Sequence, residues 1–134
     1  MNWNQETLAK LLNENQNWVI ETEGDCISIS NDEGLDAFIY AGEAQLIVES
    51  TLFPKNLVSD PHALNDIILR THQLMPLTTV CIHSIDGEEY YVAFGSLSVN
   101  SKAEVVIEEI ETLFDNVGEF LETYGQYLKQ EALA

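Results

Sequence analysis

The C-terminal stretch from Ser101 to Glu131, SKAEVVIEEIETLFDNVGEFLETYGQYLKQE, carries the pattern that decides the fold. Apolar residues recur in it at steps of three and four, which predicts one long amphipathic helix. The predicted apolar stripe consists of Val106, Ile110, Leu113, Val117, Phe120, Leu121, Tyr124 and Leu128. Ser101 and Glu104 fit a capping box at the start of this helix. A helix that is apolar on one side and acidic on the other must lie across an apolar surface, and we expect the preceding residues to supply a sheet.

The charge balance of the chain is strongly acidic. The 134 residues include 23 acidic and only 5 Lys or Arg residues, for a formal net charge of -18. Such a surface repels phosphate backbones and anionic lipid headgroups, which argues against nucleic-acid binding and against direct membrane insertion. A partner protein with a basic segment is the natural complement, although acidity can also serve solubility alone.

The cysteines and the N-terminal residues indicate the compartment. Residues 1–10 lack the basic start and apolar core of a secretory signal, and no apolar run approaches the length of a membrane span. Cys26 and Cys81 are isolated from each other in sequence, and each falls within a predicted strand. We therefore expect reduced, buried thiols instead of a disulfide, in a cytoplasmic protein.

The rest of the chain reads as two groups of strands separated by a helix. Residues 4–15 predict a helix, residues 18–22, 26–30, 35–41 and 44–53 an antiparallel meander, and residues 61–74 a second helix with Asp60 as its N-cap. Residues 78–85 and 88–98 predict a hairpin with Asp86-Gly87 at its turn. Gly95, inside the last strand, indicates a bulge or a close approach of another segment. The prediction is a single α+β domain over residues 1–134, with a mostly antiparallel sheet in the order α-β-β-β-β-α-β-β-α.

The strands carry more aromatic residues than a fully solvated face would hold. Phe38, Tyr40, Phe53 and Tyr91 are the residues that we predict to form a partner-binding surface or a homodimer contact. The alternative is an ordinary assignment of these side chains to the core.

The sequence shows no catalytic, metal-binding or cofactor-binding constellation. The histidines and cysteines match no closed zinc spacing, and neither Ser84 nor Ser96 lies in a nucleophile elbow. No glycine-rich phosphate loop is present. We therefore predict a protein that is not an enzyme and has no cofactor. The remaining alternative is a small hydrolase or ligand-binding protein, which would require His83, Asp86 and Tyr90 to converge in one cleft.

Three segments resemble a known family: HQLMPLT at residues 72–78, FGSLS at residues 94–98 and VIEEIETL at residues 106–113. Together they are similar to the YjfI-like family of uncharacterised bacterial proteins, and the similarity extends over essentially the whole chain. The resemblance implies a fold similar to class I type III secretion chaperones and to YbjN-like domains. It also implies a small cytosolic protein without a known reaction, and it carries no catalytic residues over to this chain.

Two further expectations follow from this resemblance. Secretion chaperones are small, acidic and dimeric, and they wrap an extended partner segment over apolar patches. Together with the acidic surface and the surplus aromatic residues on the strands, this makes a non-enzymatic, dimeric module that binds a partner polypeptide the leading hypothesis. Genes of the resembled family often accompany one for a membrane-remodelling protein similar to phage shock protein A. The second hypothesis is therefore a regulator that engages a basic helical surface of such a protein.

Overall fold

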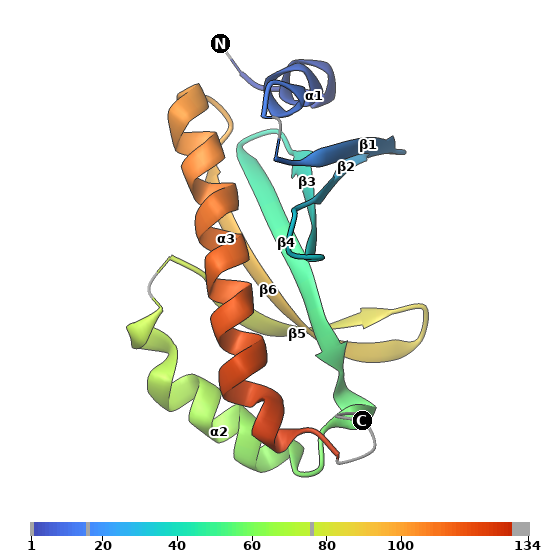
Figure 1. Ribbon diagram of the computed structural model, residues 1–134, viewed down its shortest axis with the longest axis vertical. Helices are drawn as coiled ribbons and strands as arrows, with labels where there is room; N and C mark the ends of the chain where they lie inside the picture. Colours follow the sequence, from blue (N-terminus) through green and yellow to red (C-terminus); the bar gives the residue numbers. More distant parts are fainter. Residues whose placement is uncertain (1, 16, 76, 130–134) are drawn as a thin grey trace.

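The computed structural model describes residues 2–15, 17–75 and 77–129 (Figure 1). In chain order its elements are α1 (Gln5–Asn13), β1 (Val19–Glu23), β2 (Cys26–Ser30), β3 (Asp36–Ala41), β4 (Gln45–Pro54), α2 (Pro61–Thr71), β5 (Thr79–Ile85), β6 (Glu88–Ser98) and α3 (Ala103–Tyr124). Short 3-10 turns at Lys55–Leu57, His72–Leu74 and Gly125–Tyr127 follow β4, α2 and α3. The α+β class and the predicted order of elements are confirmed.

The strands form one antiparallel sheet in the order β1-β2-β3-β4-β6-β5. The first four strands pair in chain order, as the predicted meander requires. β6 then pairs with β4 along most of its length, so the two longest strands join the two halves of the sheet. α3 runs along one face of the sheet (Figure 1). α1 lies near the N-terminal end of α3, and α2 lies near its C-terminal end.

The apolar stripe of α3 seals the core as predicted. Its buried residues are Val106, Ile110, Leu113, Phe114, Val117, Phe120 and Tyr124. They meet the residues of the sheet that point toward the helix, among them Ile29, Ile39 and Val48, which are fully buried. Leu121 and Leu128 are half-buried, and Leu128 lies beyond the helix in an isolated bridge with Val58. The helix therefore contributes most of the stripe and the following turn contributes its end.

The turn between β5 and β6 has the residues and the geometry that the sequence predicted. Asp86 and Gly87 both have positive φ, 51° and 82°. Two left-handed residues in succession are the geometry of the two-residue turn that matches the twist of antiparallel strands. Asp60 also caps α2 as expected, since its carboxylate accepts the Ala63 N–H at 3.2 Å.

The predicted cap at the start of α3 and the predicted end of α2 were wrong. No side chain caps α3: the Ser101 hydroxyl donates to the Ser98 carbonyl at 2.7 Å, so this serine closes the turn out of β6 instead of starting the helix. The α-helix α2 ends at Thr71, and the chain tightens into a 3-10 turn that brings the ring of His72 to the first residues of β5. There the Val80 N–H donates to His72 Nε2 at 3.1 Å.

Phe53 and Tyr91 lie in the core, which corrects their assignment to a partner-binding surface. They are 6% and 1% exposed, and their rings pack with centroids 5.4 Å apart. The Tyr91 hydroxyl is satisfied by Asn65 of α2 at 2.5 Å. A register shift in β4 between Thr51 and Phe53 turns Phe53 toward the helices, an irregularity that simple alternation along the strand does not predict.

Gly95 marks the close approach that the sequence indicated. A Cβ atom at this position would collide with the carboxylate of Glu109 and would touch the Leu77 carbonyl oxygen at 3.5 Å. The three segments that carry the family resemblance therefore meet at one point of the structure. Burial in this contact, followed by the nearby charge of Glu108, raises the pKa of the Glu109 carboxyl.

Candidate functional site

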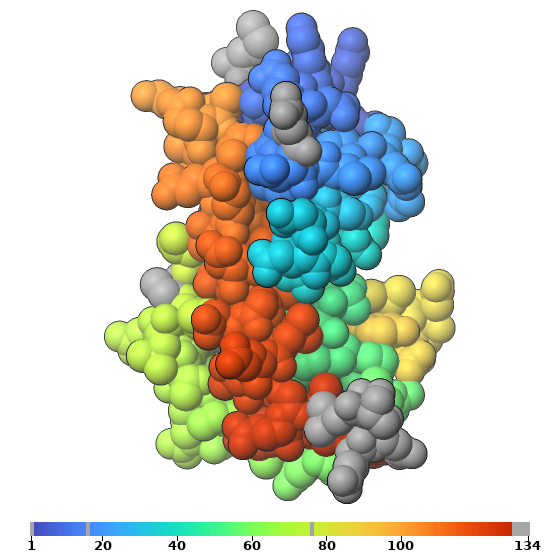
Figure 2. Space-filling view, viewed as in Figure 1, coloured from blue at the N-terminus to red at the C-terminus, as the bar shows by residue number. Residues whose placement is uncertain are grey.

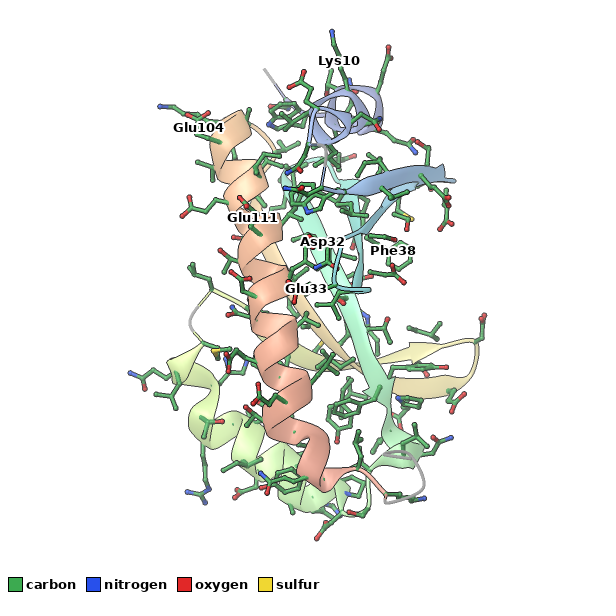
Figure 3. The ribbon with its side chains drawn as sticks, viewed as in Figure 1. Lys10, Asp32, Glu33, Phe38, Glu104 and Glu111 are labelled. Carbon is green, nitrogen blue, oxygen red and sulfur yellow. The ribbon has the colours of Figure 1, made fainter. Side chains whose placement is uncertain are left out.

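The face of the sheet that points away from α3 has its own apolar surface, which we call the open face. Register places on it the cross-strand pairs that are not directed at the helices: Phe38 opposite Glu49, Tyr40 opposite Ile47, and Phe94 opposite Glu49 from the other neighbouring strand. Figure 3 shows Phe38 projecting from β3 on the side away from α3. The open face comprises Phe38, Tyr40, Ile47, Glu49, Cys81, Tyr90, Val92 and Phe94.

Val92 is the centre of a local packing on the open face. It is only 1% exposed, yet it does not belong to the main core cluster of the described residues. Its cross-strand neighbours are Thr51 on β4 and Cys81 on β5, and its flanking residues on the same face are Tyr90 and Phe94. Burial of Val92 outside the core cluster, among these neighbours, indicates an apolar patch on the outer side of the sheet.

Glu49 lies in the middle of this patch. Desolvation raises the pKa of Cys81 and of Cys26, and the charge of Glu49 raises both further; Glu23 and Asp25 also act on Cys26. Both thiols are half-buried, their raised pKa values favour the protonated form, and no disulfide joins them. The carboxylate itself is half-buried between Phe38 and Phe94, where a cationic group would be held more strongly than in open solvent.

None of the five Lys and Arg residues lies in a strand. Lys10 and Arg70 are on α1 and α2, and Lys55, Lys102 and Lys129 lie in or beside the segments that connect to helices. The strands carry carboxylates at Glu21, Glu23, Asp36 and Glu49 on the side of the open face. The open face is therefore apolar and acidic without an internal basic counter-charge.

The solvent side of α3 forms a second feature, the acidic ridge. Six exposed carboxylates follow one another at steps of three and four along the helix: Glu104, Glu108, Glu111, Asp115, Glu119 and Glu122. Figure 2 shows α3 running along the middle of this side of the molecule, and Figure 3 shows Glu104 and Glu111 pointing away from the sheet. The helix itself contains no Lys or Arg.

The structure tests the metal-site and hydrolase alternatives within the described residues. No group of three or more His, Cys, Asp or Glu side chains there could hold a metal ion. His83 and Asp86 are exposed on the β5–β6 hairpin, and the Tyr90 hydroxyl is 3.4 Å from the Glu88 carboxylate. The groove of about 470 Å³ beside this hairpin is lined by none of these three residues, so the cleft that the hydrolase alternative requires is not formed there.

Of the four predicted surface residues, the structure keeps Phe38 and Tyr40 together on the open face. Sequence reasoning missed Ile47, Val92 and Phe94 as members of the same surface. The alternation of Tyr90, Val92 and Phe94 along β6 is visible in the sequence, but it does not say which side the helices cover. Cross-strand register supplies that information, because it ties Phe94 to Glu49 and Glu49 to Phe38.

Comparison with solved structures defines the class of fold. YbjN from E. coli, described as a putative transcription regulator, matches with a TM-score of 0.65 at 15% identity over 95% of this chain and 96% of that chain. The ExsC–ExsE complex matches with a TM-score of 0.64 at 10% identity, over 91% of this chain and 96% of the matched chain. An uncharacterised protein from Methanothermobacter thermautotrophicus matches equally well, with a TM-score of 0.64 at 8% identity over 93% and 99% of the two chains. The fold is the one shared by YbjN and the ExsC–ExsE chain.

Sequence comparison then gives the family. Residues 2–128 match the family described as uncharacterised protein conserved in bacteria (DUF2170), and the chain belongs to this family. It is 36% identical to the uncharacterised protein YjfI of Escherichia coli K12 over 131 residues, which are 95% of this chain and 98% of YjfI. The predicted resemblance is confirmed. No helix in the described part of the chain combines the length and apolar character needed to cross a membrane.

Proposed function

We propose that this protein is a non-enzymatic module that binds another polypeptide in the cytoplasm through the open face of its sheet. The observation that carries the proposal is the apolar patch around Val92, with Phe38, Tyr40 and Phe94 outside the core and Glu49 among them. An apolar patch with a half-buried carboxylate fits a partner segment that has apolar side chains and a Lys or Arg opposite Glu49.

The comparisons support this proposal at the level of fold. One structure with the same fold is a complex between two proteins, ExsC and ExsE. Fold similarity alone does not transfer a function, so the proposal depends on the chemistry of the open face. The protein acts as one domain and as a homodimer in this proposal, as the sequence led us to expect.

The test is co-purification with variants matched for folding. The tagged protein is expressed in its native host, and bound proteins are compared between the wild type, the double variant Phe38→Ser/Phe94→Ser and the control Glu104→Gln/Glu111→Gln. A partner of the open face is retained by the wild type and by the control and is lost from the first variant. Absence of any specific partner from the wild type, or equal retention by both variants, would overturn the proposal.

The acidic ridge supports a second candidate, a regulator of a membrane-stress protein similar to phage shock protein A. Six carboxylates on one side of α3 would attract a basic helical surface over long range. Association of this kind weakens steeply with salt because the charges are exposed. The same co-purification at low and high salt separates the two candidates: a ridge partner is released by salt and by the Glu104→Gln/Glu111→Gln variant, whereas a partner held by the open face persists.

A further inference from the structure

The two edges of the sheet differ in how they are protected. β1, at one edge, is five residues long, contacts α1 and carries Glu21 and Glu23. β5, at the other edge, has seven residues and contains no Asp, Glu, Lys or Arg. Natural proteins use charge, proline or short length to stop edge strands from pairing with other chains. β5 lacks these devices in a chain whose net charge is -18.

The backbone of β5 presents unsatisfied groups at this edge. The two-residue turn at Asp86-Gly87 makes Ile85 and Glu88 a hydrogen-bonded pair, so His83 and Cys81 also bond to β6, while Val80, Ile82 and Ser84 direct their N–H groups outward. The hydrogen bond from the Val80 N–H to His72 Nε2 agrees with this alternation. It also means that the Val80 N–H is not free to pair with an added strand. Within the described residues the N–H groups of Ile82 and Ser84 have no partner.

Three apolar side chains are exposed on or beside this edge. Ile82 and Ile85 are 37% and 40% exposed, and Leu69 of α2 is 78% exposed. Leu69 and Ile82 line one shallow groove of about 230 Å³ between α2 and the edge of β5. The far end of the β5–β6 hairpin extends beyond the helices (Figure 1). A strand added to β5 would therefore cover apolar surface as well as pair with the backbone.

We propose that β5 pairs antiparallel with β5 of a second copy of this chain, around a two-fold axis at His83. This register sets Ile82 opposite Ser84 of the second copy and Ser84 opposite Ile82, so both open N–H groups of each copy find an acceptor. Ile85 faces Cys81 of the second copy on the open face, and the two His83 residues form the central pair. Any register centred elsewhere either leaves an open N–H unpaired or needs the Val80 N–H that His72 already holds.

The lack of charge in β5 makes this edge accessible to a second copy of an acidic chain. The surfaces of two chains that each carry a net charge of -18 repel, and β5 is a strand edge where no like charges would meet. A basic partner segment finds no carboxylate in β5, whereas it finds Glu49 on the open face. The pairing deepens the proposed function, because it joins the open faces of the two copies into one continuous surface, but it does not depend on a partner being present.

Matched variants at the two edges test the pairing without any partner. Size-exclusion chromatography with light scattering is expected to give twice the mass of one chain for the wild type. Ile82→Lys, which places a charge on the β5 edge, is expected to give a monomer with an unchanged circular dichroism spectrum. The control Val19→Lys alters an exposed residue of the β1 edge and is expected to remain a dimer. A monomeric wild type, or a dimer that survives Ile82→Lys, would refute the proposal.

Cysteine substitution tests the register. In a Cys26→Ser/Cys81→Ala background, His83→Cys puts two thiols in a central pair that is not hydrogen-bonded, with Cα atoms about 4.5 Å apart and within disulfide range. Oxidation is expected to convert the dimer to a covalent one. Ser84→Cys, whose equivalent lies two residues along in the second copy, is expected to cross-link on the order of tenfold less. Faster cross-linking at Ser84 than at His83 would rule out this register. The two proposals fail separately. A dimer whose open-face variants retain the partner refutes the proposed function alone, and a monomeric wild type whose open-face variants lose the partner refutes the pairing alone.

Discussion

Replacing Gly95 with alanine tests the contact in which the three family segments meet. The added Cβ would overlap the Glu109 carboxylate and stand 3.5 Å from the Leu77 carbonyl, which is an ordinary contact. Overpacking of this kind costs about 1–3 kcal/mol. Because the overlapping atoms are the end of a flexible, half-buried side chain, we expect a value near the lower limit, about 1–1.5 kcal/mol. Without the overlap, glycine-to-alanine substitution gains about 0.4–1 kcal/mol through the unfolded state.

A double-mutant cycle isolates that overlap. Gly95→Ala is expected to destabilise the wild type and to be neutral or stabilising in a Glu109→Ala background, with a coupling free energy of about 1–2 kcal/mol. Urea unfolding followed by tryptophan fluorescence and by circular dichroism measures each corner of the cycle. Gly118→Ala is the matched control, because a Cβ there meets no atom within 4 Å, and we expect it to stabilise the helix by about 0.5–1 kcal/mol. A coupling below about 0.3 kcal/mol would show that Glu109 does not occupy the space over Gly95.

Three further predictions concern pH, the two kinds of aromatic residue and the edge strand. Because the pKa of Glu109 is raised, the folded state binds more protons than the unfolded state between the ordinary glutamate pKa and the folded pKa. The free energy of unfolding should therefore fall as the pH rises through this range. Glu109→Gln should flatten that part of the plot of urea midpoint against pH. Phe53→Ala should cost about 3–5 kcal/mol because the ring is in the core, whereas Phe38→Ala on the open face should cost below about 1 kcal/mol; equal costs in urea unfolding would contradict the assignment of the two faces. His72→Ala should lower stability by about 1 kcal/mol and speed amide hydrogen exchange at Val80, and unchanged exchange there would disprove the hydrogen bond.

Local sequence signals were sufficient for the order of elements. The spacing of Ile110, Leu113 and Val117 identified α3 because a helical stripe is set by residues close in sequence. The Asp86-Gly87 dipeptide identified the hairpin because only left-handed residues fit its turn. The predicted cap at Ser101 failed since the same hydroxyl had a competing acceptor, the Ser98 carbonyl, in the turn out of β6.

The candidate site depended on information that local patterns do not contain. Alternation divides β6 into two sets of residues, but tertiary packing decides which set the helices cover. The sequence therefore could not show whether Tyr91 or Phe94 faces the core. The register shift in β4 moved Phe53 to the core by inserting one residue that no turn or periodicity announces. The open face emerges only when Phe38, Glu49 and Phe94 are aligned across three strands, two of which are distant in sequence.

The separation of apolar and charged surfaces limits how such a protein can assemble. Phe38 and Phe94 contribute little to the core, so their place on the open face is better explained by binding than by stability. A second copy, which is itself acidic, is disfavoured by Glu49 on that face and by the ridge on α3, and it meets no charge on β5. In the proposed arrangement, self-association therefore uses the neutral edge and leaves both open faces available, each with a carboxylate that selects a basic partner over another copy of the chain.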